Sequence, residues 1–220
     1  MAAMKTLLLG VLLIILIGVG GLLYRNAIEH PLQPITCPLD AEVCPDGTSV
    51  SRTGSSCTFP ACPPPNVTLQ DIGIAFAIPD GFAAASLPDP SSIAAYEMTA
   101  TTSTATTSTA DIIIRRYSID ASSTALAVIQ QTAISIVTNA PAPVTSFSST
   151  VIGMHRFTVV SLGRIGGVVD TAYYLTRGAD VLRFDAVDKG VVNWNDPALD
   201  SRSLPAHAAL LKLLSTLQGE

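Results

Sequence analysis

The stretch Val168–Val187, VVDTAYYLTRGADVLRFDAV, has the pattern of two strands that face each other across a tight turn. β-Branched and aromatic residues are frequent in both halves, as they are in the strands of sheets. Between them, Arg177-Gly-Ala-Asp180 supplies residues that short turns favour. A connection this short can only join antiparallel strands, because a parallel pair needs a long crossover. The stretch therefore predicts an antiparallel hairpin over 168–176 and 181–187.

Further strand patterns lie on the amino-terminal side of this hairpin. The clearest is 72–78, where Ile or Phe alternates strictly with smaller residues until Pro79-Asp-Gly81 supplies turn chemistry. The predicted strands before the hairpin are 72–78, 82–86, 93–99, 110–117, 147–151 and 154–162. Their short connections extend the antiparallel sheet.

Two helices interrupt this series of strands. Ser122-Ser123 offers an N-cap, and apolar residues then recur at helical spacing, which predicts a helix over about 123–138. Pro205 opens a second helix. The residues expected on its inner face are Leu210, Leu211, Leu214 and Leu217. Four strands, a helix, four strands and a helix predict an α+β fold with an antiparallel sheet flanked by helices.

The amino-terminal region is the most apolar part of the chain. Thr6–Tyr24 holds 19 residues without a charge, between Lys5 and Arg25. As a helix this run would measure about 30 Å, the hydrocarbon thickness of a bilayer. A cleaved signal peptide is the competing interpretation, but bulky residues occupy Leu22–Tyr24, where its cleavage site would need small ones. The sequence predicts an uncleaved transmembrane helix over 6–24.

Four cysteines follow this segment, Cys37, Cys44, Cys57 and Cys62, and there are no others. Their spacing lacks the tight pairs of structural zinc sites and the CxxC of redox sites. It favours two disulfides over a zinc site or free thiols, although spacing does not choose among the three pairings. Disulfides persist outside the cytoplasm, which predicts that the chain beyond residue 25 is outside and the amino terminus inside.

The cysteine segment resembles part of a Kazal-like module. Val43-Cys44, Asp46-Gly47-Thr48, Cys57 and Ala61-Cys62 stand in the order of that family's core. The resemblance implies an interlaced pairing, Cys37 with Cys57 and Cys44 with Cys62. Kazal domains have six cysteines, and their inhibitory loop lies among those absent here, so the resemblance does not imply protease inhibition.

Residues 67–220 are similar to PsbP-like domains. The opening run Ile72–Phe82, IGIAFAIPDGF, matches the first hairpin of that family, with Phe82 where Trp is common. The later matches are Ile152-Gly153, Arg156-Phe157, Tyr173-Tyr174 and the helix Ala208–Leu217. The resemblance implies an α-β-α sandwich that serves as a binding or assembly module, usually without enzymatic activity.

These patterns divide the chain into six predicted segments. They are a cytoplasmic amino terminus (1–5), a transmembrane helix (6–24), a tether (25–36), a disulfide-rich module (37–62), a proline-rich linker (63–66) and the α+β domain (67–220). The Ala, Ser and Thr tract at 99–109 predicts a long hairpin loop, with an O-glycosylated tract as the alternative.

Sequence motifs for catalysis are weak. The three histidines, His30, His155 and His207, are scattered, and no G-x-S-x-G is present. Gly163–Gly167 lacks the spacing of a phosphate loop and predicts a hairpin turn. We therefore predict no catalytic, cofactor-binding or metal-ligating residues. The alternative is an extracytoplasmic hydrolase with a site that the sequence does not reveal.

One loop is a candidate for contact with a partner. Its residues are Asp188, Asn193, Trp194, Asn195 and Asp196. The competing interpretation is a surface loop capped by Asp and Asn side chains, with Trp194 packed over the sheet. Residues 67–220 carry nine Lys and Arg against thirteen Asp and Glu, a net charge of −4, which disfavours nucleic acid. The chain is predicted to be a single-pass, membrane-anchored, extracytoplasmic binding or assembly module, with an envelope protein as a candidate partner.

Overall fold

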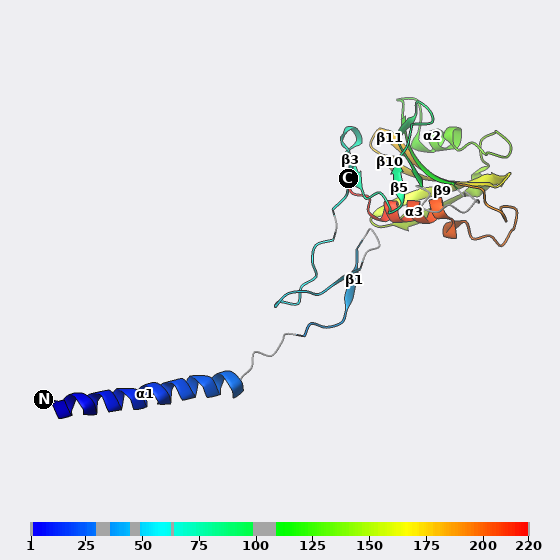
Figure 1. The fold of residues 1–220 in the computed structure, drawn as a ribbon. Helices are drawn as coiled ribbons and strands as arrows, with labels where there is room; N and C mark the ends of the chain where they lie inside the picture. The colour runs from blue at the N-terminus through cyan, green and yellow to red at the C-terminus, as the bar shows by residue number, and fades with distance from the viewer. Residues whose placement is uncertain (1, 30–35, 45–48, 63, 99–108, 220) are drawn as a thin grey trace. The chain divides into compact units, whose positions relative to one another are not determined.

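The computed structural model describes residues 2–29, 36–44, 49–62, 64–98 and 109–219 (Figure 1). The chain divides into two compact units, Met1–Ala41 with Ser51–Pro60, and Glu42–Val50 with Ala61–Glu220. The second unit holds the α+β domain. Most of the 99–109 tract, residues 30–35 of the tether, and Pro63 lie outside the described residues, so the boundaries expected there stay predictions.

The amino-terminal helix α1 runs over Ala2–Glu29. Its side chains are described for residues 10–25, all of which are exposed. Among the described residues, no helix is both long enough and apolar enough to cross a membrane. The membrane span over 6–24 is therefore not confirmed and stays a prediction.

The cysteine segment contains two disulfides, Cys37–Cys57 and Cys44–Cys62. The prediction of two disulfides is confirmed, with the pairing that the Kazal-like resemblance implied. The resemblance itself is not shown. Two short strands, β1 (Ala41–Val43) and β2 (Ser49–Ser51), form a small sheet.

Besides the disulfides, a backbone bridge between Thr53 and Thr58 and the contacts of Arg52 hold residues 51–60. Arg52 donates through Nε to Asp40 at 2.8 Å and through Nη1 to the carbonyl oxygen of Cys57 at 3.0 Å, and its guanidinium lies 4.2 Å from the centre of the Phe59 ring. Exposed contacts of this kind contribute little, whereas a disulfide typically contributes about 2–4 kcal/mol.

We expect reduction to unfold residues 36–62 while the α+β domain stays folded, because that domain contains no cysteine. Hydrogen exchange measured with and without reductant would show rapid exchange confined to 36–62. Cooperative loss of structure through 67–219 on reduction would contradict this independence.

The α+β domain is built on an antiparallel sheet of seven strands in the order β5-β6-β7-β11-β10-β9-β8. The strands are β5 (Phe82–Ala84), β6 (Ser92–Met98), β7 (Thr109–Ser118), β8 (Phe147–Ile152), β9 (His155–Ile165), β10 (Val168–Arg177) and β11 (Asp180–Lys189). The hairpin predicted first, over 168–187, forms β10 and β11. Gly166 and Gly167, both with positive φ, turn the chain between β9 and β10, as predicted.

One predicted strand is wrong in its extent. In place of a strand over 72–78, the chain forms β3 (Val67–Leu69), a 3-10 turn η1 (Gln70–Ile72) and β4 (Ile74–Phe76). Gly73 ends η1 in the left-handed conformation, with φ 61°, and so separates Ile72 from β4. The alternating pattern could not show this break, because Gly73 fits the alternation as a small residue.

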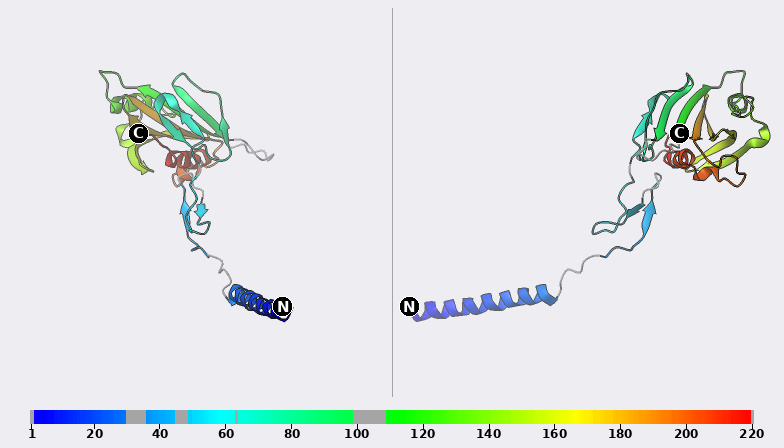
Figure 2. Two further views of the ribbon diagram at one scale, coloured as in Figure 1. Left: turned by 90° about the vertical axis from the view of Figure 1, so that its left-hand side faces the viewer. Right: turned by 45° about the vertical axis from the view of Figure 1, so that its right-hand side comes forward.

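The two helices of the domain cover opposite faces of the sheet (Figures 1 and 2). Helix α3 (Pro205–Ser215) packs against the apolar core of one face, which includes Tyr173, Phe157 and Phe184. Of the predicted inner residues, Leu210 and Leu214 are buried and Leu211 is partly buried, and Leu213 is buried as well. Leu217 is also buried, but it lies beyond the end of the helix, which is shorter than predicted. Helix α2 (Ala125–Thr132) packs on the other face beside Val160, Leu162 and Tyr174. The predicted class, an α+β fold with a large antiparallel sheet, is confirmed.

Helix α2 is shorter than the predicted helix over 123–138, and its N-cap is Thr124 rather than Ser122-Ser123. It ends at Thr132, whose carbonyl oxygen accepts from Arg183 Nη1 at 2.5 Å. Beyond it, the backbone N–H of Ile136 donates to the carbonyl oxygen of Leu162 on β9 at 2.9 Å. Bonds to the sheet thus replace the last turns of the expected helix.

Gly163 allows this segment to approach β9. Its φ is 125°, and a Cβ added there would lie 2.7 Å from Val137 Cγ2 and 3.3 Å from Ile136 Cγ1. A side chain at this position would therefore strain the backbone and also have to displace the Val137 side chain.

We expect Gly163→Ala to lower the free energy of unfolding by about 2–4 kcal/mol, which urea denaturation would measure. Gly166→Ala is the matched control, because Gly166 has φ 57° but nothing within 4 Å of an added Cβ. It should cost only about 1–2 kcal/mol. Equal losses in the two variants would contradict the close approach at Gly163.

Candidate ligand-binding site

Charged side chains occupy the centre of the sheet face that α2 only partly covers. Arg115 on β7 lies opposite Arg183 on β11, and Asp185 is two residues further along β11 on the same face. Asp170 on β10 lies on this face too, two residues before Ala172, which pairs with Asp185. Strand alternation therefore brings two guanidiniums and two carboxylates together.

Asp185 is the centre of this cluster. It is fully buried and accepts from Arg183 Nε at 2.6 Å and from Arg115 Nη1. Arg115 Nε also donates to Asp89 Oδ2 at 3.0 Å, from the loop before β6. Burial alone would raise the pKa of Asp89, but hydrogen bonds from Ser91 and Arg115 lower it to about 2. Both guanidiniums are thus engaged by protein acceptors.

Asp170 differs from the other carboxylates. Asp170 is 8% exposed, and its Oδ1 atom has no hydrogen-bond partner among the residues that the structure describes. Burial, with the nearby charge of Asp185, raises its pKa to about 7. The pairing of β10 with β9 shifts register between Asp170 and Thr171, where Leu162 is the extra residue, on β9. An extra residue of this kind forms a β-bulge, and bulges often adjoin functional sites.

A cavity of about 430 Å³ opens over this cluster. Its volume is within the range of pockets that hold small ligands. Its lining residues are Asp89, Ser91, Arg115, Tyr117, Thr132, Ile134, Ser135, Ile136, Asn139, Asp170 and Arg183. The walls come from the loop before β6 and from the segment that follows α2, where Asn139 holds a positive φ of 52°. We call this the α2-side cavity.

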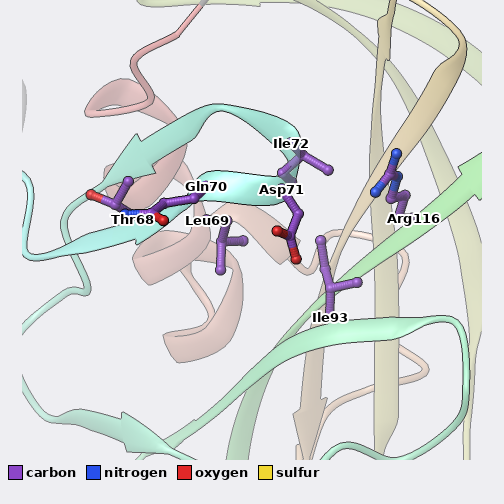
Figure 3. A pocket seen from close by; sticks show the side chains of 7 residues that line it. All are labelled: Thr68, Leu69, Gln70, Asp71, Ile72, Ile93 and Arg116. Carbon is purple, nitrogen blue, oxygen red and sulfur yellow. The ribbon is translucent and has the colours of Figure 1, made fainter.

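A second cavity, of about 440 Å³, adjoins η1 (Figure 3). Its lining residues are Thr68, Leu69, Gln70, Asp71, Ile72, Ile93 and Arg116. Arg116 Nη2 donates to Asp180 Oδ2 at 2.8 Å, and its side chain is over a third exposed. Unlike the α2-side cavity, this one has no carboxylate that is both buried and unpartnered among the described residues.

The two described histidines lie elsewhere. His207 is buried in the first turn of α3, with Nε2 2.7 Å from the Tyr173 hydroxyl oxygen, and burial lowers its pKa to about 4. His155 Nε2 is 3.2 Å from the carbonyl oxygen of Leu217. Neither is among the residues that line the two cavities. His30 lies outside the described residues.

The predicted partner loop is divided by the structure. Asp188 belongs to β11, is buried, and caps α3 by accepting from the backbone N–H groups of Ala206 at 2.7 Å and His207 at 3.3 Å. Burial raises its pKa to about 6. Including Asp188 in the loop was therefore wrong. The remaining members are on the loop: Asn193, Asn195 and Asp196 are exposed and Trp194 is half-buried.

Sequence reasoning missed all of the acidic and basic residues of the α2-side cavity. A signal was present in β11, where Leu182, Phe184 and Ala186 form one apolar face and Arg183 and Asp185 alternate with them. That pattern usually means an exposed face. Only the fold shows that the polar face of β11 is central in the sheet and buried.

Comparison with known proteins adds little to this description. No family model and no curated protein matches the chain. A crystal structure from Bacteroides thetaiotaomicron VPI-5482 aligns with a TM-score of 0.40 and 12% identity, over 67% of this chain and 45% of that one. The solution structure of cyanobacterial PsbP (CyanoP) from Synechocystis sp. PCC 6803 aligns with a TM-score of 0.44 and 11% identity, over 70% of this chain and 91% of that one. Similarity at this level does not establish a family, and the PsbP-like resemblance stays a prediction.

Proposed function

We propose that this protein is a membrane-anchored, extracytoplasmic binding module without catalytic activity, and that its ligand occupies the α2-side cavity. The observation that carries the proposal is Asp170, a mostly buried carboxylate that lines this cavity and whose Oδ1 has no hydrogen-bond partner among the described residues. A buried charge without a partner is costly for folding. Such a group is a functional-site candidate when it adjoins a cavity.

The location rests on two further features. The disulfides Cys37–Cys57 and Cys44–Cys62 support an oxidising compartment outside the cytoplasm. The uncharged run 6–24 at the amino terminus supports a single membrane anchor with the following chain outside.

Binding can be tested with the full-length protein in detergent. Thermal unfolding in the presence of a library of small polar molecules should identify ligands that stabilise the protein. Asp170→Asn should remove this stabilisation. Asp111→Asn should keep it, because Asp111 lies on β7 outside the α2-side cavity and pairs with the exposed Lys189. A library without any Asp170-dependent ligand would contradict the binding proposal.

The anchor has a separate test. The protein should sediment with membranes and resist extraction by high salt and by alkaline carbonate. A soluble species that begins between Gly21 and Ala27 would instead show a cleaved signal peptide and refute the anchor, while leaving the cavity proposal intact.

A further inference from the structure

We propose that the ligand of the α2-side cavity is a small hydroxylated primary amine, an amino alcohol or amino sugar in chemical class, whose ammonium group binds Asp170. This inference rests on the proposed binding function and specifies its ligand. It follows from the hydrogen-bonding groups that the cavity leaves available.

The groups available in the cavity favour a ligand that donates hydrogen bonds over one that accepts them. Arg183 already donates to Asp185 and to the carbonyl oxygen of Thr132, and Arg115 donates to Asp89 and Asp185. Each guanidinium has further N–H groups, but its charge is already paired with these carboxylates, so an anionic ligand gains less from it. Asp170 Oδ1, by contrast, has no competing donor among the described residues. Because Asp170 lines the cavity, a ligand that donates to its carboxylate would offset the cost of burying that group.

The charge balance favours a cationic donor over a neutral one. The cluster contains three carboxylates, those of Asp89, Asp170 and Asp185, against two guanidiniums. With Asp170 ionised, the cluster therefore has a net charge of −1. An ammonium neutralises this charge and donates up to three hydrogen bonds. A quaternary amine would supply the charge without the donors.

The rest of the lining suits hydroxyl groups. Ser91, Tyr117 and Ser135 present hydroxyls, and Asn139 presents an amide, around a cavity of about 430 Å³. Hydroxyl and amide groups both donate and accept, so they match the hydroxyls of a polyol. The segment 133–143 that forms one wall contains no ionisable side chain, which leaves Asp170 as the group that recognises charge.

The direct test uses glucamine and sorbitol, a linear amine and a polyol that differ only by an ammonium in place of one hydroxyl. Titration calorimetry with the full-length protein in detergent should detect glucamine binding and much weaker sorbitol binding. Asp170→Asn should weaken glucamine about 10- to 100-fold. Asp111→Asn should leave its affinity unchanged.

The pH dependence supplies a second readout that a folding defect would not mimic. The titratable and charged groups around Asp170 are Asp89, Arg115, Tyr117, Tyr174, Arg183 and Asp185. The ammonium binds the ionised form of Asp170, whose pKa is about 7 in the free protein. Glucamine affinity should therefore rise about tenfold between pH 6 and pH 8 in the wild type and stay flat in Asp170→Asn.

The outcomes separate this inference from the proposed function. Equal binding of sorbitol and glucamine, or glucamine binding that weakens as pH rises, overturns the ammonium inference. Failure of glucamine together with Asp170-dependent ligands of other chemistry in the library overturns the inference alone. Failure of glucamine in a library without Asp170-dependent ligands overturns both proposals.

Discussion

Asp185→Ala should lower the free energy of unfolding by about 3–5 kcal/mol, the cost expected when one partner of a buried ion pair is removed. Asp185 is fully buried and accepts hydrogen bonds from two arginines. Without it, the mostly buried Arg183 retains, among the described residues, only the carbonyl oxygen of Thr132 as an acceptor. Chemical denaturation monitored by circular dichroism would measure the loss.

The matched control lies on the same strand. Asp180, at the start of β11, pairs with a partly exposed Arg116 at 2.8 Å, so Asp180→Ala should cost no more than about 1 kcal/mol. The double variant Arg183→Met with Asp185→Leu should recover much of the loss, because it removes both charges and Arg115 keeps Asp89 as its partner. A cost below about 1 kcal/mol for Asp185→Ala would show that the cluster does not stabilise the fold.

Much of the fold could be predicted because most strands of the sheet carry an alternating or β-branched pattern within their own residues. Seven of the eight predicted strands correspond to β5–β11. Six were recognised from alternating or β-branched residues, and 82–86 was predicted as the return from the Pro79-Asp-Gly81 turn. Predictions failed where tertiary contacts replaced local ones. The α2 helix stops at Thr132 because Arg183 binds its carbonyl oxygen and β9 pairs with Ile136, and neither partner is near in sequence.

The candidate site could not be predicted for a related reason. Asp89, Arg115, Asp170 and Arg183 come from four separate segments, and no two of them form a recognisable motif. The last three meet because β7, β11 and β10 are neighbours in the sheet, although β8 and β9 intervene in sequence, and Asp89 joins them through its ion pair with Arg115. Trp194 and its polar neighbours were predicted to form a partner-contacting loop because they are close together along the chain. Proximity along the chain was a poor guide to the cavity.

Asp170→Asn should stabilise the protein by about 2–4 kcal/mol at pH 8. Burial raises the pKa of Asp170 to about 7 in the folded state, against about 3.9 in an unfolded chain. Folding therefore takes up a proton between these values. The stabilising contribution of protonated Asp170 is fully present below about pH 4 and is lost as the pH rises through about 7. The amide, which carries no charge, avoids this loss.

Comparing the two proteins across pH separates Asp170, together with its neighbour Asp185 whose pKa burial also raises, from the other titratable groups. Asp188, with a pKa raised to about 6 by burial, and His207, with a pKa lowered to about 4 by burial, also change the pH dependence of stability. Both are present in wild type and variant, so their contributions cancel in the difference. That difference should grow by up to about 1.4 kcal/mol per pH unit between pH 4 and 7 and level off above pH 8. Denaturant titrations at pH 5, 6, 7 and 8 would measure it.

A pH-independent difference would mean that Asp170 has an ordinary pKa and is solvated in the folded protein, which would also remove the basis for a ligand at this position.

If Asp170→Asn instead gains stability and loses ligand binding, Asp170 is destabilising in the free protein and is required by the ligand. The wild-type chain would then retain a carboxylate that costs stability because the ligand requires it, a trade-off common at binding sites. Only the unliganded protein bears that cost. Saturating ligand should therefore raise the stability of the wild type toward that of Asp170→Asn, and a wild type that remains equally unstable when saturated would show that the ligand does not satisfy Asp170.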